Sequence, residues 1–167
     1  MRMMQNRTRR LTVRDSPSRA AKPATEKGES VAPLKTSVFL VIEGVPVAKP
    51  RQTRSDKWNQ RPCVMKYRKW ADEARRILKA KTGIERLLGA SKVDATFYFP
   101  MPAGWSRKKK AEMRGMPHRQ KPDCDNCAKS VMDALIVNDE TVYRATVYKE
   151  WCLTEREAGK VEVIIHP

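Results

Sequence analysis

Carboxylates gather in one short stretch of a chain that is otherwise strongly basic. The stretch covers residues 121–142 and contains Asp123, Asp125 and Asp139. Carboxylate oxygens suit Mg²⁺, which keeps several waters and takes further ligands from substrate phosphates. Lysines and arginines around such a site would hold the other phosphates of a polyanion. The pattern therefore predicts a metal-dependent enzyme that acts on nucleic acid, and it favours a nuclease.

These acids flank a predicted helix that begins at Asp125 or Asn126. Asp123 and Asp125 lie in the loop that enters the helix, and Asp139 lies in the turn that follows it. We therefore expect the three carboxylates to converge on one cation, which would activate water and stabilise charge on the scissile phosphate. Lys129 lies one helical turn after Asp125, so its ammonium is expected to contact the phosphate or the leaving oxygen.

Each of these residues also has a purely structural explanation. Asp125 can be only a helix N-cap, Asp125 and Lys129 can be only an exposed ion pair, and Asn138-Asp139 can be only a turn. Taken singly, short polar patterns of this kind are more often structural than functional. Their combination within a basic chain favours the metal site.

The charge of the whole chain indicates an anionic partner. Among 167 residues, 35 Lys and Arg outweigh 19 Asp and Glu, which gives a formal net charge of +16. Such an excess favours nucleic acid or an anionic surface. No apolar run approaches the roughly 18 residues of a membrane-spanning helix, so we expect no membrane partner. The four cysteines, without an export signal, are expected to be reduced thiols in the cytoplasm.

The elements that must position the acids follow from hydrophobic periodicity. Residues 1–35 are polar and rich in arginine, which predicts a disordered basic tail before a single domain at residues 36–167. Alternating or β-branched runs predict strands at residues 37–43, 93–99, 141–151 and 160–165. Helical spacing predicts helices at residues 66–81 and 106–113, besides the one after Asp125. The expected fold is α+β: a mixed sheet of about four strands with two main helices packed on it.

Several basic residues outside the acidic stretch are candidates for contacts with DNA phosphates. They are Lys49, Arg51, Arg54, Lys108, Lys109, Lys110 and Lys121. Trp58 or Trp105 could stack on bases. Basic runs are more often solvated faces, and tryptophans are more often core residues. These residues would equally serve a non-catalytic DNA-binding protein, but such a protein would gain nothing from carboxylates that face the phosphate backbone.

A zinc ribbon is a second alternative. It would use Cys124 and Cys127, completed by His118 or Cys152. A single CxxC pair without a second pair at ribbon spacing is a weak signal. Cys127 also falls on the apolar side of the predicted helix, where a thiol commonly packs as a small hydrophobic group. The zinc site therefore ranks below the carboxylate site.

The order of residues in the acidic stretch resembles a known family. Residues 121–135 read Lys-Pro-Asp-x-Asp-Asn-x-x-Lys-x-x-x-Asp-Ala-Leu, and a turn with an aspartate and a strand ending in Lys149 follow. This arrangement resembles the RusA family of Holliday-junction resolvases, found in bacteria and their prophages, over about residues 38–165. The resemblance implies that Asp123, Asp125 and Asp139 bind Mg²⁺, which Mn²⁺ could replace, and that Lys129 assists catalysis.

The resemblance also implies a substrate and an assembly. A member of this family is a homodimer that cuts two opposed strands of a four-way DNA junction symmetrically, in recombination and repair. The chain departs from the family pattern at Asn138, where a first aspartate is usual, although the second, Asp139, is the one the family uses. The segment from Ala134 to Asp139 is also short, and Cys127 replaces a usual leucine, which we expect to affect packing only.

Overall fold

The computed structural model describes residues 30–51, 53–58 and 61–167. Most of the basic tail expected at residues 1–35 lies outside this range. Its last residues do not, because strand β1 (Val31–Pro33) pairs in parallel with strand β3 (Arg86–Leu88). These backbone hydrogen bonds attach residues 31–33 to β3, and the domain boundary at residue 35 stays a prediction.

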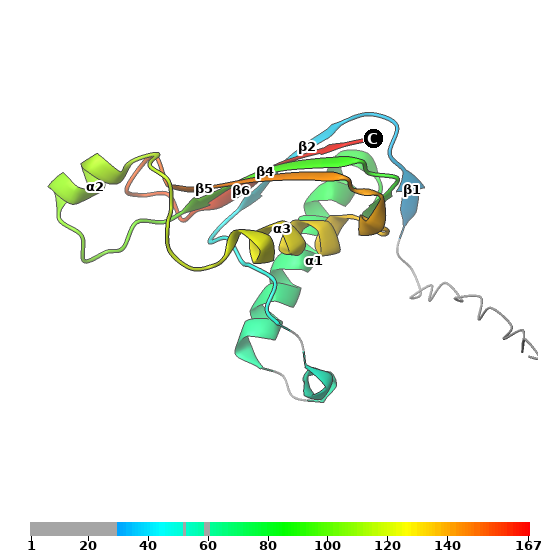
Figure 1. Cartoon of the computed structure of the whole chain (residues 1–167), viewed down its shortest axis with the longest axis horizontal. Coiled ribbons are helices and arrows are strands. Elements are labelled where there is room, and N and C mark those ends of the chain that lie inside the picture. The colour runs from blue at the N-terminus through cyan, green and yellow to red at the C-terminus, as the bar shows by residue number, and fades with distance from the viewer. Residues whose placement is uncertain (1–29, 52, 59–60) are drawn as a thin grey trace, which may run out of the picture.

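A mixed sheet of four strands forms the centre of the molecule (Figure 1). Its order is β2 (Val38–Glu43), β6 (Lys160–His166), β4 (Lys92–Phe99) and β5 (Arg144–Trp151). Strand β6 runs antiparallel to both of its neighbours, whereas β4 and β5 are parallel. Every second residue of β4 is buried, as alternation of apolar and polar side chains predicts for a strand with one covered face. The predicted α+β fold is confirmed.

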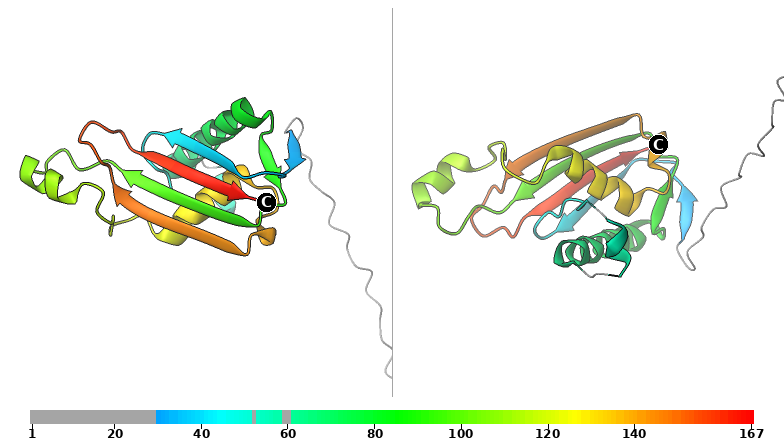
Figure 2. Two further views of the ribbon diagram at one scale, coloured as in Figure 1. Left: turned by 90° about the horizontal axis from the view of Figure 1, so that it is seen from above. Right: turned by 60° about the horizontal axis from the view of Figure 1, so that its bottom comes forward.

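Two helices, α1 (Pro62–Thr82) and α3 (Cys124–Leu135), lie on the same face of this sheet (Figure 2). Helix α1 begins four residues before the predicted start, with a proline in its first turn, where a missing amide donor costs nothing. Its buried side chains include Trp70, Ala74 and Leu78, on the predicted stripe. No helix in the described part of the chain is long and apolar enough to cross a membrane.

A short helix, α2 (Arg107–Met113), lies beyond the end of the sheet (Figure 1). It belongs to residues 100–120, which we call the arm and which connect β4 to the loop before α3. Ser106 caps α2 as predicted, since its hydroxyl accepts a hydrogen bond from the amide of Lys109 at 3.3 Å.

The C-terminal end of α3 is held by two arginines from other elements. Its last turn contains no basic residue. The Nε atom of Arg75, on α1, donates to the carbonyl of Ala134 at 3.1 Å, and Nη2 of Arg86, on β3, donates to the carbonyl of Ile136 at 2.6 Å. Both guanidinium groups bind carbonyls that have no partner within the helix, at the negative end of its dipole. Helix α3 is therefore fixed to α1 and to β3.

Replacing Arg86 with methionine should lower the free energy of unfolding by about 1.5–3 kcal/mol, the range for a hydrogen bond from a charged donor. Methionine keeps an aliphatic side chain, so the loss would report the carbonyl contacts at the end of α3. Urea denaturation followed by circular dichroism measures it. In the matched control Arg76→Met, which removes an exposed pair with Glu73, the midpoint should stay near wild type. Equal losses in the two variants would contradict the role given to Arg86.

Candidate functional site

Two of the predicted metal ligands lie at the N-terminal end of α3. The helix begins at Cys124, slightly before the predicted start, and Asp123 occupies the N-cap position. Its carboxylate makes no capping hydrogen bond, although this is the usual reason for an aspartate there. Asp125 lies in the first turn and is exposed. The explanation of Asp125 as an N-cap is therefore wrong, and neither carboxylate is used to cap the helix.

Lys129 pairs with Asp125 one turn into α3. Its Nζ lies 3.4 Å from Oδ2 of Asp125, and the two side chains are 55% and 64% exposed. An ion pair this exposed contributes little to stability and separates easily. The contact keeps the ammonium of Lys129 beside the carboxylate of Asp125, and both groups stay accessible to other partners.

The third predicted ligand, Asp139, lies at the other end of α3. It begins the short 3-10 helix η2 (Asp139–Thr141), which follows the C-terminus of α3. The 12 residues of α3 span about 18 Å at 1.5 Å per residue. Asp139 is therefore separated from Asp123 and Asp125 by roughly the length of the helix.

Strand β5 gives a second measure of this separation. The amide of Tyr143, shortly after η2, donates to the carbonyl of Ser91 at 3.0 Å. Six residues later, Nζ of Lys149 donates to the carbonyl of Gln120 at 2.6 Å and to the carbonyl of Pro122, next to Asp123. Six residues of a strand cover about 20 Å. The two ends of α3 thus lie against opposite ends of β5.

The expected convergence of the three carboxylates within one chain is therefore wrong. The described residues include no group of three or more His, Cys, Asp or Glu side chains arranged to hold a metal ion. The physical reason is the straight helix between the acids, which keeps its ends apart. The metal-binding and catalytic roles of Asp123, Asp125, Lys129 and Asp139 remain predictions.

Lys149 positions the loop that leads into α3. Besides its side-chain bonds to Gln120 and Pro122, its carbonyl accepts a hydrogen bond from the amide of His118 at 2.7 Å. The sequence marked Lys149 only as the end of the motif, because nothing in it shows that a strand lysine will bind carbonyls almost 30 residues earlier. By fixing these carbonyls, Lys149 sets the position of Asp123.

Lys49, predicted to contact DNA phosphates, forms an ion pair with Asp133 of α3. The two side chains are about 30% exposed, and the amide of Lys49 donates to the carbonyl of Asn126 at 3.0 Å. These contacts tie the loop after β2 to α3. Lys49 therefore has a structural partner already, and its contact with DNA remains a prediction.

The loop that contains Arg51 and Arg54 is organised by the buried carboxylate of Asp56. This group accepts hydrogen bonds from the amide of Thr53 and from Nη2 of Arg61, both at 2.6 Å. The hydrogen bond from Arg61 is the main cause that lowers the pKa of Asp56 to about 2, so the group stays charged near neutral pH. Arg61 also donates to the carbonyl of Arg51 at 2.8 Å. The loop is thus held with the side chains of Arg51 and Arg54 exposed.

The remaining predicted DNA contacts lie on the arm and just before α3. Lys108, Lys109 and Lys121 are exposed, whereas Lys110 lies 3.8 Å from Glu155. In Figure 1, the N-terminal end of α3 lies between α2 on one side and the N-terminal end of α1 on the other. The acidic end of α3 is thereby flanked by basic segments that are far apart in the sequence.

The proposed zinc ligands do not gather in the structure. Cys124 is exposed, while Cys127 is buried, and burial raises the pKa of its thiol to about 11. The ring of His118 stacks on Phe99 and packs at a tilt against Trp151. Cys152 is also buried, and burial raises its pKa to about 11. Since the described residues hold no metal-ligating cluster, the zinc ribbon finds no support.

The native protein should show two classes of thiol towards Ellman's reagent at pH 8. Cys63 and Cys124 are exposed and should react within minutes. Cys127 and Cys152 should react only after unfolding, because a buried thiol with a pKa raised to about 11 stays protonated and inaccessible. Cys124→Ser should remove one fast thiol and leave the slow class unchanged. Protection of Cys124 in the native protein, relieved by a chelator, would instead revive the zinc site.

Comparison with protein families agrees with the motif. The family model described as Endodeoxyribonuclease RusA matches residues 43–166 of the chain. The matched region contains α1, α3 and the strands β4, β5 and β6 in full. It includes the four residues with predicted catalytic roles. No curated protein matches the chain.

Proposed function

Because the chain belongs to the endodeoxyribonuclease RusA family, we propose that it is a Mg²⁺-dependent nuclease that resolves four-way DNA junctions by paired nicks. The observation that carries the proposal is the pair of carboxylates, Asp123 and Asp125, that begins α3 without capping it. These two exposed acids lie two residues apart and neither caps the helix, whereas a cation would gain two hard oxygen ligands from them. The basic segments on both sides supply contacts for phosphates.

Asp123 and Asp125 fit Mg²⁺ by their chemistry, but within the described part of one chain no third His, Cys, Asp or Glu completes a metal-holding group with them. We propose that Asp139 of a second copy completes the set. A dimer with two-fold symmetry that pairs α3 with its copy in antiparallel orientation would bring the N-terminal end of each helix to the C-terminal end of the other. Asp139 would then lie near Asp123 and Asp125 of the opposite chain. Two equivalent sites would result, as two opposed cuts require.

The residues of the site then have distinct tasks. Asp123 and Asp125 would hold the ion, which would supply a water of lowered pKa and offset charge on the phosphate. Lys129 forms only an exposed ion pair with Asp125, so its ammonium would be free to contact negative charge that develops on the phosphate once Asp125 serves as a ligand. Lys149 keeps the loop before Asp123 in place. Exposed residues such as Arg54 and Lys108 hold the flanking phosphates.

Asp125→Asn should bind a four-way junction with near wild-type affinity and cut it at least about 10²-fold more slowly, as expected when a charged group at the reacting phosphate is lost. A junction, a fork and a linear duplex of equal sequence would be incubated with Mg²⁺ and the products mapped on every strand. Symmetric nicks confined to the junction are expected from the wild-type protein. Glu73→Gln, a carboxylate-to-amide change at a half-exposed residue of α1, should cut normally. Wild-type cleavage by Asp125→Asn would refute its assignment.

Mixed dimers test whether the site is shared between two chains. Differently tagged Asp125→Asn and Asp139→Asn chains would be coexpressed and the heterodimer isolated. One of its two sites would then contain three intact carboxylates, so it should nick one strand of the junction, although each parent homodimer is inactive.

The pair Asp123→Asn with Asp125→Asn is the control. Both changes lie at the same end of α3, so each site in this heterodimer lacks one acid and should stay inactive. If the first heterodimer is as inactive as the control, the site is not assembled from two chains.

A further inference from the structure

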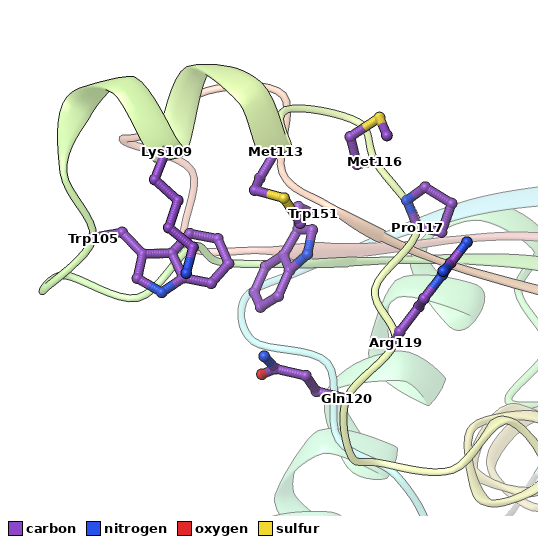
Figure 3. Close-up of a pocket in the computed structure, with 8 residues that line it drawn as sticks. All are labelled: Trp105, Lys109, Met113, Met116, Pro117, Arg119, Gln120 and Trp151. Atoms are coloured by element: carbon purple, nitrogen blue, oxygen red, sulfur yellow. The ribbon is translucent and has the colours of Figure 1, made fainter.

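A pocket on the arm lies close to the N-terminal end of α3 and takes no part in the carboxylate site (Figure 3). Its volume is about 440 Å³. The residues that matter for its chemistry are Trp105, Lys109, Met116, Arg119, Gln120 and Trp151. Aromatic and sulfur-containing side chains thus meet two cations and one amide in the same pocket.

The aromatic wall of the pocket is rigid on one side and accessible on the other. Trp151, only 3% exposed, packs against the ring of His118 with centroids 4.3 Å apart. Trp105 meets Trp151 edge to face, with centroids 4.8 Å apart and the planes at 60°. Trp105 itself is only partly buried, and Nζ of Lys109 lies 4.5 Å from its ring centroid. The buried indole of Trp151 therefore supports the partly buried indole of Trp105.

The combination of groups suits a flat heteroaromatic ring attached to a negatively charged chain. Indole rings stack on any nucleobase, and the thioether of Met116 adds a polarizable contact. The amide of Gln120 can both donate to and accept from the edge of a base. Lys109 and Arg119 are exposed at the same pocket, where they can bind the adjoining phosphates. A purely apolar ligand would make no favourable contact with the charges of Lys109 and Arg119.

The pocket is close to the carboxylates along the chain. Gln120 precedes Asp123 by three residues, a segment that spans at most about 11 Å, and Lys149 binds the carbonyls of Gln120 and Pro122 within it. Successive nucleotides of a stacked strand are about 3.4 Å apart. A base in the pocket would therefore belong to a nucleotide about three positions or fewer from a phosphate held at Asp123. A paired and stacked base cannot enter such a pocket, so the base must be unpaired.

We propose that the Trp105 pocket binds an unpaired nucleobase next to the scissile phosphate of the branched DNA. The inference rests on the proposed function, since DNA is the assumed substrate, but base capture is measured without cleavage. It gives the protein a means of distinguishing a branch point, where interrupted stacking lets base pairs open more easily, from continuous duplex. A purely structural role for Trp105, packing the arm on Trp151, is the alternative that the experiment must separate.

The first measurement is photocrosslinking in the Asp125→Asn background with Mg²⁺. Single 5-iodouracil substitutions would be placed at each of four nucleotides on either side of the crossover in a four-way junction, and crosslinked residues identified by mass spectrometry. Crosslinks to Trp105, Trp151 or Met116 are expected from positions within about three nucleotides of the cut, and not from a duplex of the same sequence. Crosslinks that avoid these residues, or that form equally with duplex, would overturn the proposal.

The second measurement compares Trp105→Ala with Trp105→Phe in the same background. Loss of one stacked base should weaken junction binding about tenfold or more in Trp105→Ala, while Trp105→Phe should stay close to the parent, and neither change should affect binding to duplex. Equal weakening for junction and duplex would mean that Trp105 only holds the arm. Junction cleavage by the wild-type protein without a crosslink at the pocket would overturn only the proposal that the pocket binds a base. Absence of junction binding would overturn the proposed function as well.

Discussion

The length of α3 is the constraint on which the rest of the structure depends. Its 12 residues hold Asp123 and Asp125 at one end and Asp139 beyond the other. Each end is tied to the rest of the fold, the first by Lys149 through the preceding loop and the second by Arg75 and Arg86. The helix cannot bend to bring the acids together without breaking these contacts. If the three acids act on one ion, they must belong to two chains.

The charges around α3 explain why its N-terminal end is suited to chemistry. The positive end of the helix dipole favours the carboxylates of Asp123 and Asp125, and the chain's excess of basic residues keeps the region attractive to phosphates. These lysine and arginine residues belong to two separate parts of the fold, the arm and the loop that Asp56 holds in place. The arm also brings the Trp105 pocket to the same end of α3. The proposed metal ligands, phosphate contacts and nucleobase site therefore lie around a single helix terminus.

The sequence predicts the helices and strands that bury a long periodic face. It does not predict features that depend on which segments or side chains pair with each other. The four strands of the central sheet and the three α-helices follow from alternating or helical spacing. The β1–β3 pair did not, because three-residue strands are too short to show a period. Partners such as Asp133 for Lys49 are set by tertiary packing and leave no sequence signal. The separation of the acids, by contrast, was implied by the length of the predicted helix.

Anomalous diffraction from crystals of the wild-type protein grown with Mn²⁺ tests the central claim most directly. Manganese takes the same oxygen ligands as magnesium and can be located without assumptions about the site. One peak is expected for each N-terminal end of α3, within coordination distance of Asp123 and Asp125 of one chain and Asp139 of the other. Peaks bound to the acids of a single chain, or peaks only at carboxylates elsewhere, would contradict it.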